Sequence, residues 1–181
     1  MKFRFSLLIC SMVSLLLVTS CKKGDTGPAG ETGPAGPVGT PNVIYSDWFT
    51  PDLYTKDTIF GIWGFNYNKT AASLTQTVLD SGAVLTFGKL EGYNPLVWPT
   101  GQVGQLPISL TYVQGSTMTD NLSASATVGN LKIRFTNNLN FYSGISNLHK
   151  FRFIVIPGGK SGARFQSLTY SEICQKYNIP E

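Results

Sequence analysis

A glycine loop with a lysine is the first feature of this sequence that could do chemistry. Residues 157–162 read PGGKSG and contain Gly159, Lys160 and Ser161, which resemble the end of a phosphate-binding loop. Such a loop also needs a glycine five positions before Gly159, where the sequence has Ile154. We therefore expect a glycine loop that leaves a strand rather than a nucleotide site.

His149 is the only histidine, so any catalytic triad would depend on it. No GxSxG motif surrounds a serine that could act with it. A lone histidine in front of a basic strand is typical of a protein surface, and we expect His149 there.

The carboxylates give no clearer sign of a reaction. Asp47, Asp52 and Asp57 stand five residues apart, unlike the alternate-position ligands of a calcium loop. A glycosidase pair such as Asp80 and Glu91 is conceivable, but nothing distinguishes these two from ordinary surface acids. The sequence predicts that the protein is not an enzyme and needs no cofactor or metal. A hydrolase with an unrecognised site stays open as an alternative.

Basic residues follow two predicted strands in a stretch, residues 121–171, that contains no acid. Lys132 and Arg134 share one strand face, and Lys150 and Arg152 share another, because side chains two apart point the same way. If the two strands are neighbours, the basic faces combine. One interpretation is a site for an anionic glycan or a lipid head group. The other is a solvated outer face that resists edge-to-edge aggregation.

Tryptophans offer a second kind of binding surface, because aromatic faces stack on sugars and peptides. Trp48 and Trp63 fall inside predicted strands, where burial in the core is the usual outcome. Trp98 lies in a segment rich in Pro and Gly, and we expect it to be exposed. The alternative is that Trp98 anchors this loop against the domain.

The elements that must position these residues are mostly strands. From residue 42 onward, short β-branched and aromatic runs alternate with Gly, Pro, Asn and Asp, which predicts an all-β fold with a β-sandwich head. The predicted strands are 43–49, 59–67, 83–90, 108–114, 122–128, 131–136 and 151–157. Residues 92–107 are predicted to form a long loop.

One or two short helices should interrupt the strands. Residues 73–76 have the form of a capping box, with Val78 and Leu79 on the inner face and Gly82 as the stop. A terminal helix over residues 171–177 would turn Ile173, Cys174 and Tyr177 inward.

Residues 1–20 are predicted to be a lipoprotein signal peptide. Lys2 and Arg4 precede an apolar run at 7–18 that is too short to span a bilayer comfortably. The run ends in VTSC, a pattern like a bacterial lipobox, so Cys21 is predicted to carry lipid and to hold the protein on a membrane. The alternative is an ordinary cleaved signal followed by a coincidental cysteine.

Cysteine use agrees with export. Cys10 leaves with the signal peptide and Cys21 takes the lipid, so Cys174 is alone and forms no internal disulfide. We expect its thiol to be buried.

The net charge shows that the chain without its predicted signal peptide is only weakly basic. The formal charge of +4 includes Lys2 and Arg4, and without them twelve basic residues face ten acidic ones. This balance does not indicate nucleic-acid binding.

Residues 21–41 hold the lipidated cysteine and a collagen-like stalk, and residues 42–181 are the head. Glycine occurs at every third position of the repeat: Gly24, Gly27, Gly30, Gly33, Gly36 and Gly39. Only glycine fits at the axis of a collagen triple helix, which predicts a homotrimer. The equally open alternative is a single-chain spacer stiffened by proline.

The order of lipobox, GDTGPAGETGPAG repeat and TPNVIYSDWF resembles the collagen-like lipoproteins of Bacteroidetes. The resemblance extends more loosely to LTQTVLDSGAVLTF, to Leu106-Pro107, and to FRFIVIPGG with LTYSEICQKYNIP. It implies an exported lipoprotein of the outer membrane or cell surface and brings no catalytic residues. The expected role is structural, adhesive or binding. A carbohydrate-binding accessory lipoprotein that uses Trp98 and the basic face is the alternative.

Overall fold

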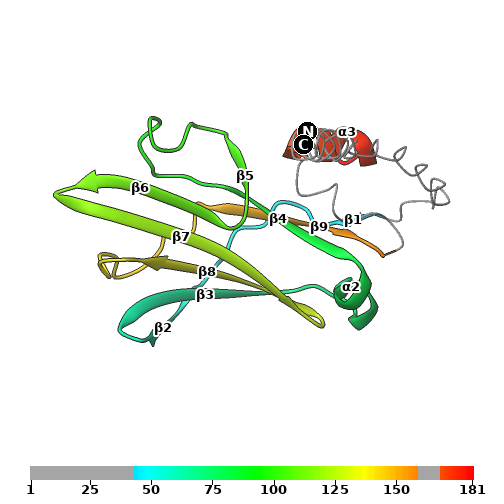
Figure 1. Cartoon of the computed structure of the whole chain (residues 1–181), viewed down its shortest axis with the longest axis horizontal. Coiled ribbons are helices and arrows are strands. Elements are labelled where there is room, and N and C mark those ends of the chain that lie inside the picture. Colours follow the sequence, from blue (N-terminus) through cyan, green and yellow to red (C-terminus); the bar gives the residue numbers. More distant parts are fainter. Residues whose placement is uncertain (1–42, 159–167) are drawn as a thin grey trace, which may run out of the picture. The chain divides into compact units, whose positions relative to one another are not determined.

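The computed structural model describes residues 43–158 and 168–181 (Figure 1). All of these belong to the unit Val38–Glu181. The signal peptide predicted for residues 1–20 and the stalk predicted for residues 21–41, with Cys21 and the repeat glycines, lie outside the described residues.

Two antiparallel sheets are the main regular structure of the described chain, which confirms the prediction of a mainly β fold. The first sheet has five strands in the order β2 (Thr55–Ile59), β3 (Ile62–Thr70), β8 (Asn130–Asn137), β7 (Ser116–Thr127) and β6 (Ile108–Gln114). The second has four strands in the order β1 (Ile44–Tyr45), β9 (Lys150–Ile156), β4 (Ala83–Lys89) and β5 (Val103–Gln105).

The two sheets share one apolar core, as in a β-sandwich. On β8 every second side chain is buried, which places Leu131, Ile133 and Phe135 on the inner face. They pack in one cluster with Phe151 and Phe153 of β9, which belongs to the other sheet. Period-two patterning therefore acts here as the sequence predicts, because only one face of β8 meets the core.

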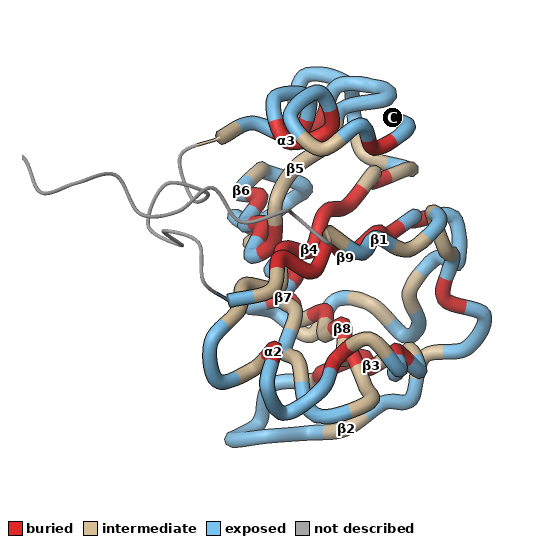
Figure 2. The backbone as a smooth tube through the Cα atoms, turned by 90° about the vertical axis from the view of Figure 1, so that its right-hand side faces the viewer, coloured by how far each residue is buried: buried red, intermediate tan, exposed pale blue. Residues whose placement is uncertain are grey.

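β9 is different, because both of its faces are buried. Its even-numbered side chains pack against a second cluster that includes helix α3 (Tyr170–Tyr177). Figure 2 shows β4 and β9 coloured mostly as buried. Ile173 and Cys174 of α3 are buried in this cluster, as the sequence predicts, and Tyr177 is partly buried. Helix α3 thus covers the outer face of the four-stranded sheet.

The helix ends are set by side-chain caps. In α3 the Thr169 hydroxyl accepts from the Glu172 backbone N–H, and the Glu172 carboxylate accepts from the Thr169 N–H, which is a capping box. Helix α2 (Gln76–Ser81) is capped by Thr75, not by Ser73 as predicted, and it ends at Gly82. None of the helices in the described ranges has the length and apolar character needed to cross a membrane.

Several predicted boundaries were wrong. The strand predicted over residues 59–67 crosses the turn at Phe60 and Gly61 that separates β2 from β3, and β2 itself was not predicted. The strand predicted over residues 43–49 is regular only at Ile44–Tyr45.

Strand β7 begins at Ser116 rather than at residue 122, because Gly115, with a φ of +74°, makes a tight turn directly after β6. Residues 92–107, predicted to be loop throughout, contain strand β5, which pairs with β4.

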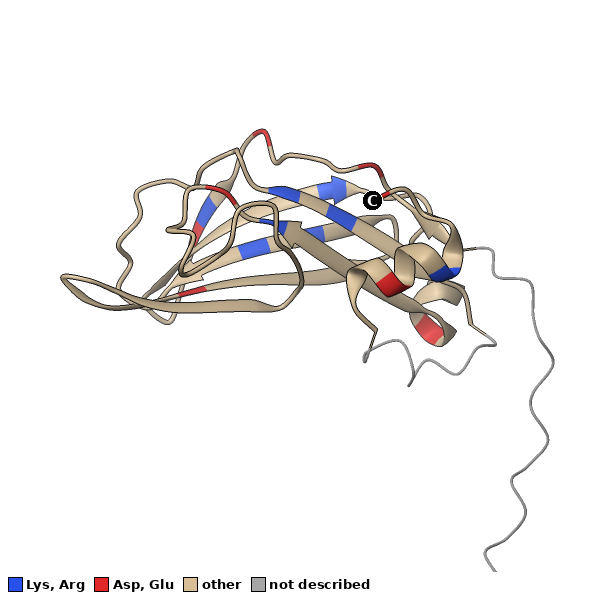
Figure 3. Cartoon of the chain, turned by 90° about the horizontal axis from the view of Figure 1, so that it is seen from above, with Lys and Arg blue, Asp and Glu red and all other residues tan. Residues whose placement is uncertain are grey.

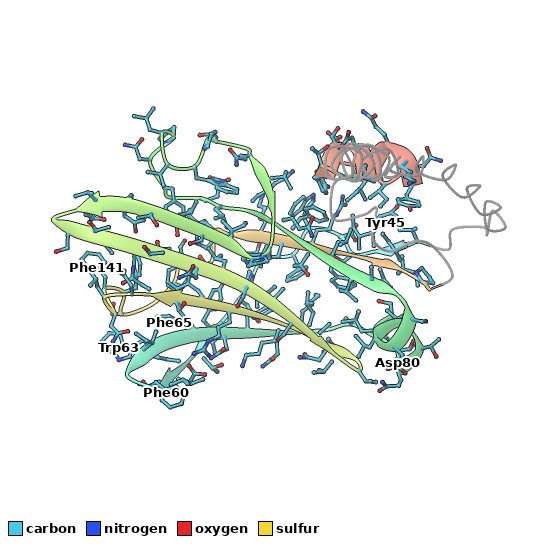
Figure 4. All side chains as sticks on the ribbon, in the orientation of Figure 1. Tyr45, Phe60, Trp63, Phe65, Asp80 and Phe141 are labelled. Carbon is cyan, nitrogen blue, oxygen red and sulfur yellow. The ribbon has the colours of Figure 1, made fainter. Side chains whose placement is uncertain are left out.

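The chain enters the described part of the head far from the tip of the β2–β3 hairpin. Ile44 pairs with Val155 near the carboxyl end of β9. The connection from β8 leads to the opposite end of β9, at Lys150. Figure 4 shows Phe60 and Phe141 together at that end, and Asp80 at the other.

Candidate functional site

The predicted basic surface does not form. Lys132 and Arg134 lie on β8 and Lys150 and Arg152 lie on β9, which belong to different sheets. Figure 3 shows the Lys and Arg positions spread over several strands. The condition that the two strands be neighbours is therefore not met, and the four cations do not add up to one face.

Arg134 is also engaged by an acid. Its Nη1 donates to Asp57 Oδ2 over 2.6 Å and to Asn66 Oδ1 over 2.8 Å. The Arg134 guanidinium holds the pKa of the Asp57 carboxyl below its ordinary value. The negative partner of Arg134 is therefore a carboxylate of the same chain. It is not the anionic ligand that one interpretation of the sequence proposed.

Arg152 is buried, against the expectation of a solvated or ligand-binding side chain. Its Nε donates to the Ser46 carbonyl over 2.9 Å, and its Nη1 donates to the Tyr170 hydroxyl over 2.7 Å and to the Pro180 carbonyl. The guanidinium lies 5.3 Å from the Trp48 ring centroid. Arg152 therefore links β9 to Ser46 near the start of the described residues and to Tyr170 and Pro180 near the C-terminus. It is buried because α3 covers this face of β9.

Trp98 is buried as well, which corrects the prediction that it is exposed. Its ring lies against Gly104 of β5, where an added Cβ would come within 2.5 Å of Trp98 Cη2. The missing side chain of Gly104 makes room for the indole, so Trp98 anchors its loop. Trp48 and Trp63 are half-buried.

His149, expected at the surface, is 5% exposed. Its Nδ1 accepts from the Glu91 backbone N–H over 3.1 Å, and its ring stacks on Tyr93 at an interplanar angle of 14°. Burial lowers the pKa of the imidazole, which is therefore neutral at pH 7. The neutral ring carries its proton on Nε2, because Nδ1 is an acceptor.

His149 and Tyr93 form part of the wall of a cavity of about 610 Å³. The other walls come from β6, from the β8–β9 connection and from the loop after β4. This volume is in the range of small-molecule sites. Three apolar residues of the wall are exposed to solvent: Leu96, Val113 and Phe141.

A buried carboxylate lies behind the tyrosines of this cavity. Asp120 is fully buried, and its Oδ2 accepts from the hydroxyls of Tyr93 and Tyr112 over 2.9 Å and of Tyr142 over 3.1 Å. Its Oδ1 accepts from Asn137 Nδ2 over 2.6 Å. The four hydrogen-bond partners of this carboxylate are all neutral groups.

The hydroxyls form a connected network. The Tyr112 and Tyr142 oxygens lie 2.5 Å apart. Each hydroxyl has a single proton, so the hydroxyl that donates to the other tyrosine shares this proton between that oxygen and Asp120. Burial, reinforced by Tyr142 and Asp120, raises the pKa of Tyr112, and burial with Asp120 raises that of Tyr93. All three tyrosines therefore stay protonated and serve as donors at neutral pH.

The charge of the cavity is negative. Among its lining residues Glu91 is the one charged side chain, and no Lys or Arg of the described chain lines it. Asp120 adds a second carboxylate behind the tyrosines. An anionic ligand would meet two carboxylates and no cation, which argues against the anionic glycan at this site.

No serine or cysteine of the described residues hydrogen-bonds to His149, and the Ser146 hydroxyl accepts from the Leu148 N–H. The described part of the chain holds no cluster of His, Cys, Asp and Glu that could bind a metal ion.

Sequence reasoning missed Asp120 as a site residue because the predicted strand began after it. With β7 starting at Ser116, alternation places Met118, Asp120 and Leu122 on the inner face, and all three are buried. A carboxylate between two apolar core residues at period two is the signal that could have identified it.

Searches of protein-family models, of curated proteins and of solved structures found no match to this chain.

Proposed function

We propose that this protein is a lipid-anchored protein of the cell envelope whose β head binds a ligand in the tyrosine-lined cavity. The observation that carries the proposal is the buried carboxylate of Asp120, held by three tyrosine hydroxyls beside an open cavity. Apolar residues of similar volume often stabilise a core as well as or better than buried charges do. A polar network beside an open cavity therefore suggests that these residues bind a ligand as well as stabilise the fold.

The position of the cavity suits a head that holds its binding site away from a membrane anchor. The first described residues lie beside the carboxyl end of β9, whereas the cavity lies at its amino end. A head joined to a membrane through residues on its N-terminal side would carry the cavity at the end remote from that connection. We propose the outer membrane or the cell surface as the location, with Cys21 as the lipidated residue.

A neutral sugar is one candidate ligand. Aromatic walls and hydroxyl groups without a nearby Lys or Arg suit a neutral polyol, so a carbohydrate-binding accessory lipoprotein stays a candidate. In this form the function no longer depends on Trp98 or on the basic residues.

Blocking the cavity tests the binding function. Gln114 lines the cavity at the end of β6, and Gln114→Trp would place an indole ring in part of it. Ser109 is exposed on the opposite face of the same strand and does not line the cavity, so Ser109→Trp is the matched control. We expect labelled full-length protein to retain ligands on an array of neutral glycans and small organic ions, and Gln114→Trp alone to abolish the signal.

Two results would contradict this function. Retention that survives Gln114→Trp would place binding elsewhere on the protein. A wild-type protein that retains nothing on the array would favour a purely structural role for the head.

Lipid attachment has its own test. We expect mass spectrometry of the mature protein to find acyl chains on Cys21, and Cys21→Ala to move the protein from the membrane fraction to the soluble fraction. An unmodified N-terminus at any residue would refute the anchor without affecting the cavity.

A further inference from the structure

Tyr93 stacks on His149, but two other pairs of aromatic rings in the cavity wall lie nearly at right angles. Tyr93 and Tyr112 have ring centroids 6.1 Å apart at an interplanar angle of 81°. Phe141 and Tyr142 have ring centroids 5.3 Å apart at an interplanar angle of 88°. Rings at right angles present faces in different directions around a shared space, and each face carries negative partial charge.

The charged groups around this space have one sign. Glu91 lines the cavity, and Asp120 holds three of the surrounding hydroxyls through a single oxygen. Buried carboxylates in proteins are usually paired with a cation or bound to a metal. Asp120 has only neutral hydrogen-bond partners, so its positive counterpart is missing from the contacts that the structure shows.

A small inorganic cation does not fit the Asp120 site. Both carboxylate oxygens already accept hydrogen bonds, and Asn137 occupies the side away from the tyrosines. An alkylated ammonium group is bound in a different way from a metal ion. It spreads its charge over methyl groups, needs no hydrogen-bond acceptor, and lies on ring faces. The exposed apolar residues Leu96, Val113 and Phe141 would contact the alkyl part of such a ligand.

We propose, on the basis of the ligand-binding function above, that this cavity recognises an organic cation with an alkylated ammonium group. Tyr93, Tyr112, Tyr142 and Phe141 contact the methyl groups, and Asp120 and Glu91 supply the negative field.

The test compares two probes that differ in charge alone. Choline and its neutral isostere 3,3-dimethylbutan-1-ol have the same shape and hydroxyl group. Binding of each to the full-length protein in a polyoxyethylene detergent is followed by the fluorescence of tyrosine and by calorimetry. We expect choline to bind about tenfold more tightly than the neutral alcohol, and the difference to shrink as salt is added.

Three variants assign the preference to the cavity. Asp120→Asn removes the buried charge and should lower the choline affinity toward that of the alcohol. Because Asp120→Asn could fail to fold, Glu91→Gln is the second variant, and it should lower the choline affinity severalfold while leaving the alcohol unchanged. Asp80→Asn removes the same charge from helix α2, at the other end of the head, and should change neither affinity (Figure 4).

The outcomes separate this inference from the binding function. Equal affinity for the two probes would overturn the inference and leave the cavity as a site for neutral ligands. Absence of choline binding would also overturn it, while retention of glycans on the array, lost in Gln114→Trp, would still support the binding function. A choline preference that persists in both Asp120→Asn and Glu91→Gln would show that the cation binds elsewhere.

Discussion

Three titratable side chains in the core of this protein have neutral hydrogen-bond partners. Asp120 accepts from hydroxyls and an amide, Arg152 donates to carbonyls and a phenol, and His149 accepts from a backbone N–H. Each such bond contributes about 1 kcal/mol, but an unpaired buried partner costs about 1–3 kcal/mol. Removal of one side chain from these networks therefore lowers the free energy of unfolding by more than the contribution of the hydrogen bond that is lost.

His149 predicts a dependence of stability on pH. Burial lowers the pKa of the folded imidazole below the ordinary value of about 6.5 that it regains on unfolding. Between these two pKa values the unfolded chain binds more protons, so stability falls as the pH decreases from about 6.5 toward the folded pKa. Protonation of Nδ1 also removes the acceptor of the Glu91 N–H.

His149→Asn provides the measurement. The Asn oxygen can accept the Glu91 N–H but does not titrate in this range. We expect urea midpoints of the wild type to fall between pH 7 and pH 5, and those of His149→Asn to fall less. Parallel curves for the two proteins would contradict this account of His149.

At the scale of elements, the β2–β3 hairpin carries a residue that does not suit its turn. Phe60 and Gly61 connect Ile59 to Ile62, which are paired, and their φ values are +50° and +81°. A two-residue loop with both φ positive favours Asn-Gly or Gly-Gly. The Phe60 side chain is fully exposed, so no packing compensates for its conformation. The side chain is at the same end as Phe141 (Figure 4).

Phe60→Asn should stabilise the head by about 1 kcal/mol, because Asn adopts positive φ with less strain than Phe. Equilibrium urea unfolding monitored by far-ultraviolet circular dichroism provides the measurement. Leu96→Asn is the control, since Leu96 is 95% exposed but has no positive φ. A gain equal to that of the control would mean that lost surface hydrophobicity, not the turn, explains the effect.

At the scale of the whole molecule, the collagen-like repeat predicts an assembly. We expect the chain from residue 22 to be a trimer, because a spacer would not require glycine at every third position over six triplets. Gly33 would then lie at the crowded axis, where a methyl group has no room. Gly33→Ala should lower the temperature at which the polyproline signal is lost.

The mass of the chain in solution and its circular dichroism on heating test this assembly. A monomeric wild type without a cooperative loss of the polyproline signal would identify the repeat as a single-chain spacer. A trimer that is indifferent to Gly33→Ala would show that the head holds the subunits together.

Several features were set by local sequence patterns. Short β-branched and aromatic runs bounded by turn residues identified β4, β6, β8 and β9, and the inward residues of α3 followed from helical spacing. The burial of Cys174 followed from its apolar neighbours. The predicted signal peptide and the collagen-like repeat were identified in the same way, because each is a pattern of residue types along the chain.

The candidate site depended on contacts between distant segments. A strand shows which side chains share a face, but it does not show which sheet it joins or what covers that face. β8 and β9 joined different sheets, so the basic residues separated. Helix α3 covered β9 and buried Arg152, and Gly104 admitted Trp98. Asp120 met Tyr93, Tyr112 and Tyr142 from three different segments. Such contacts arise from the packing of layers, which the local period of a sequence does not encode.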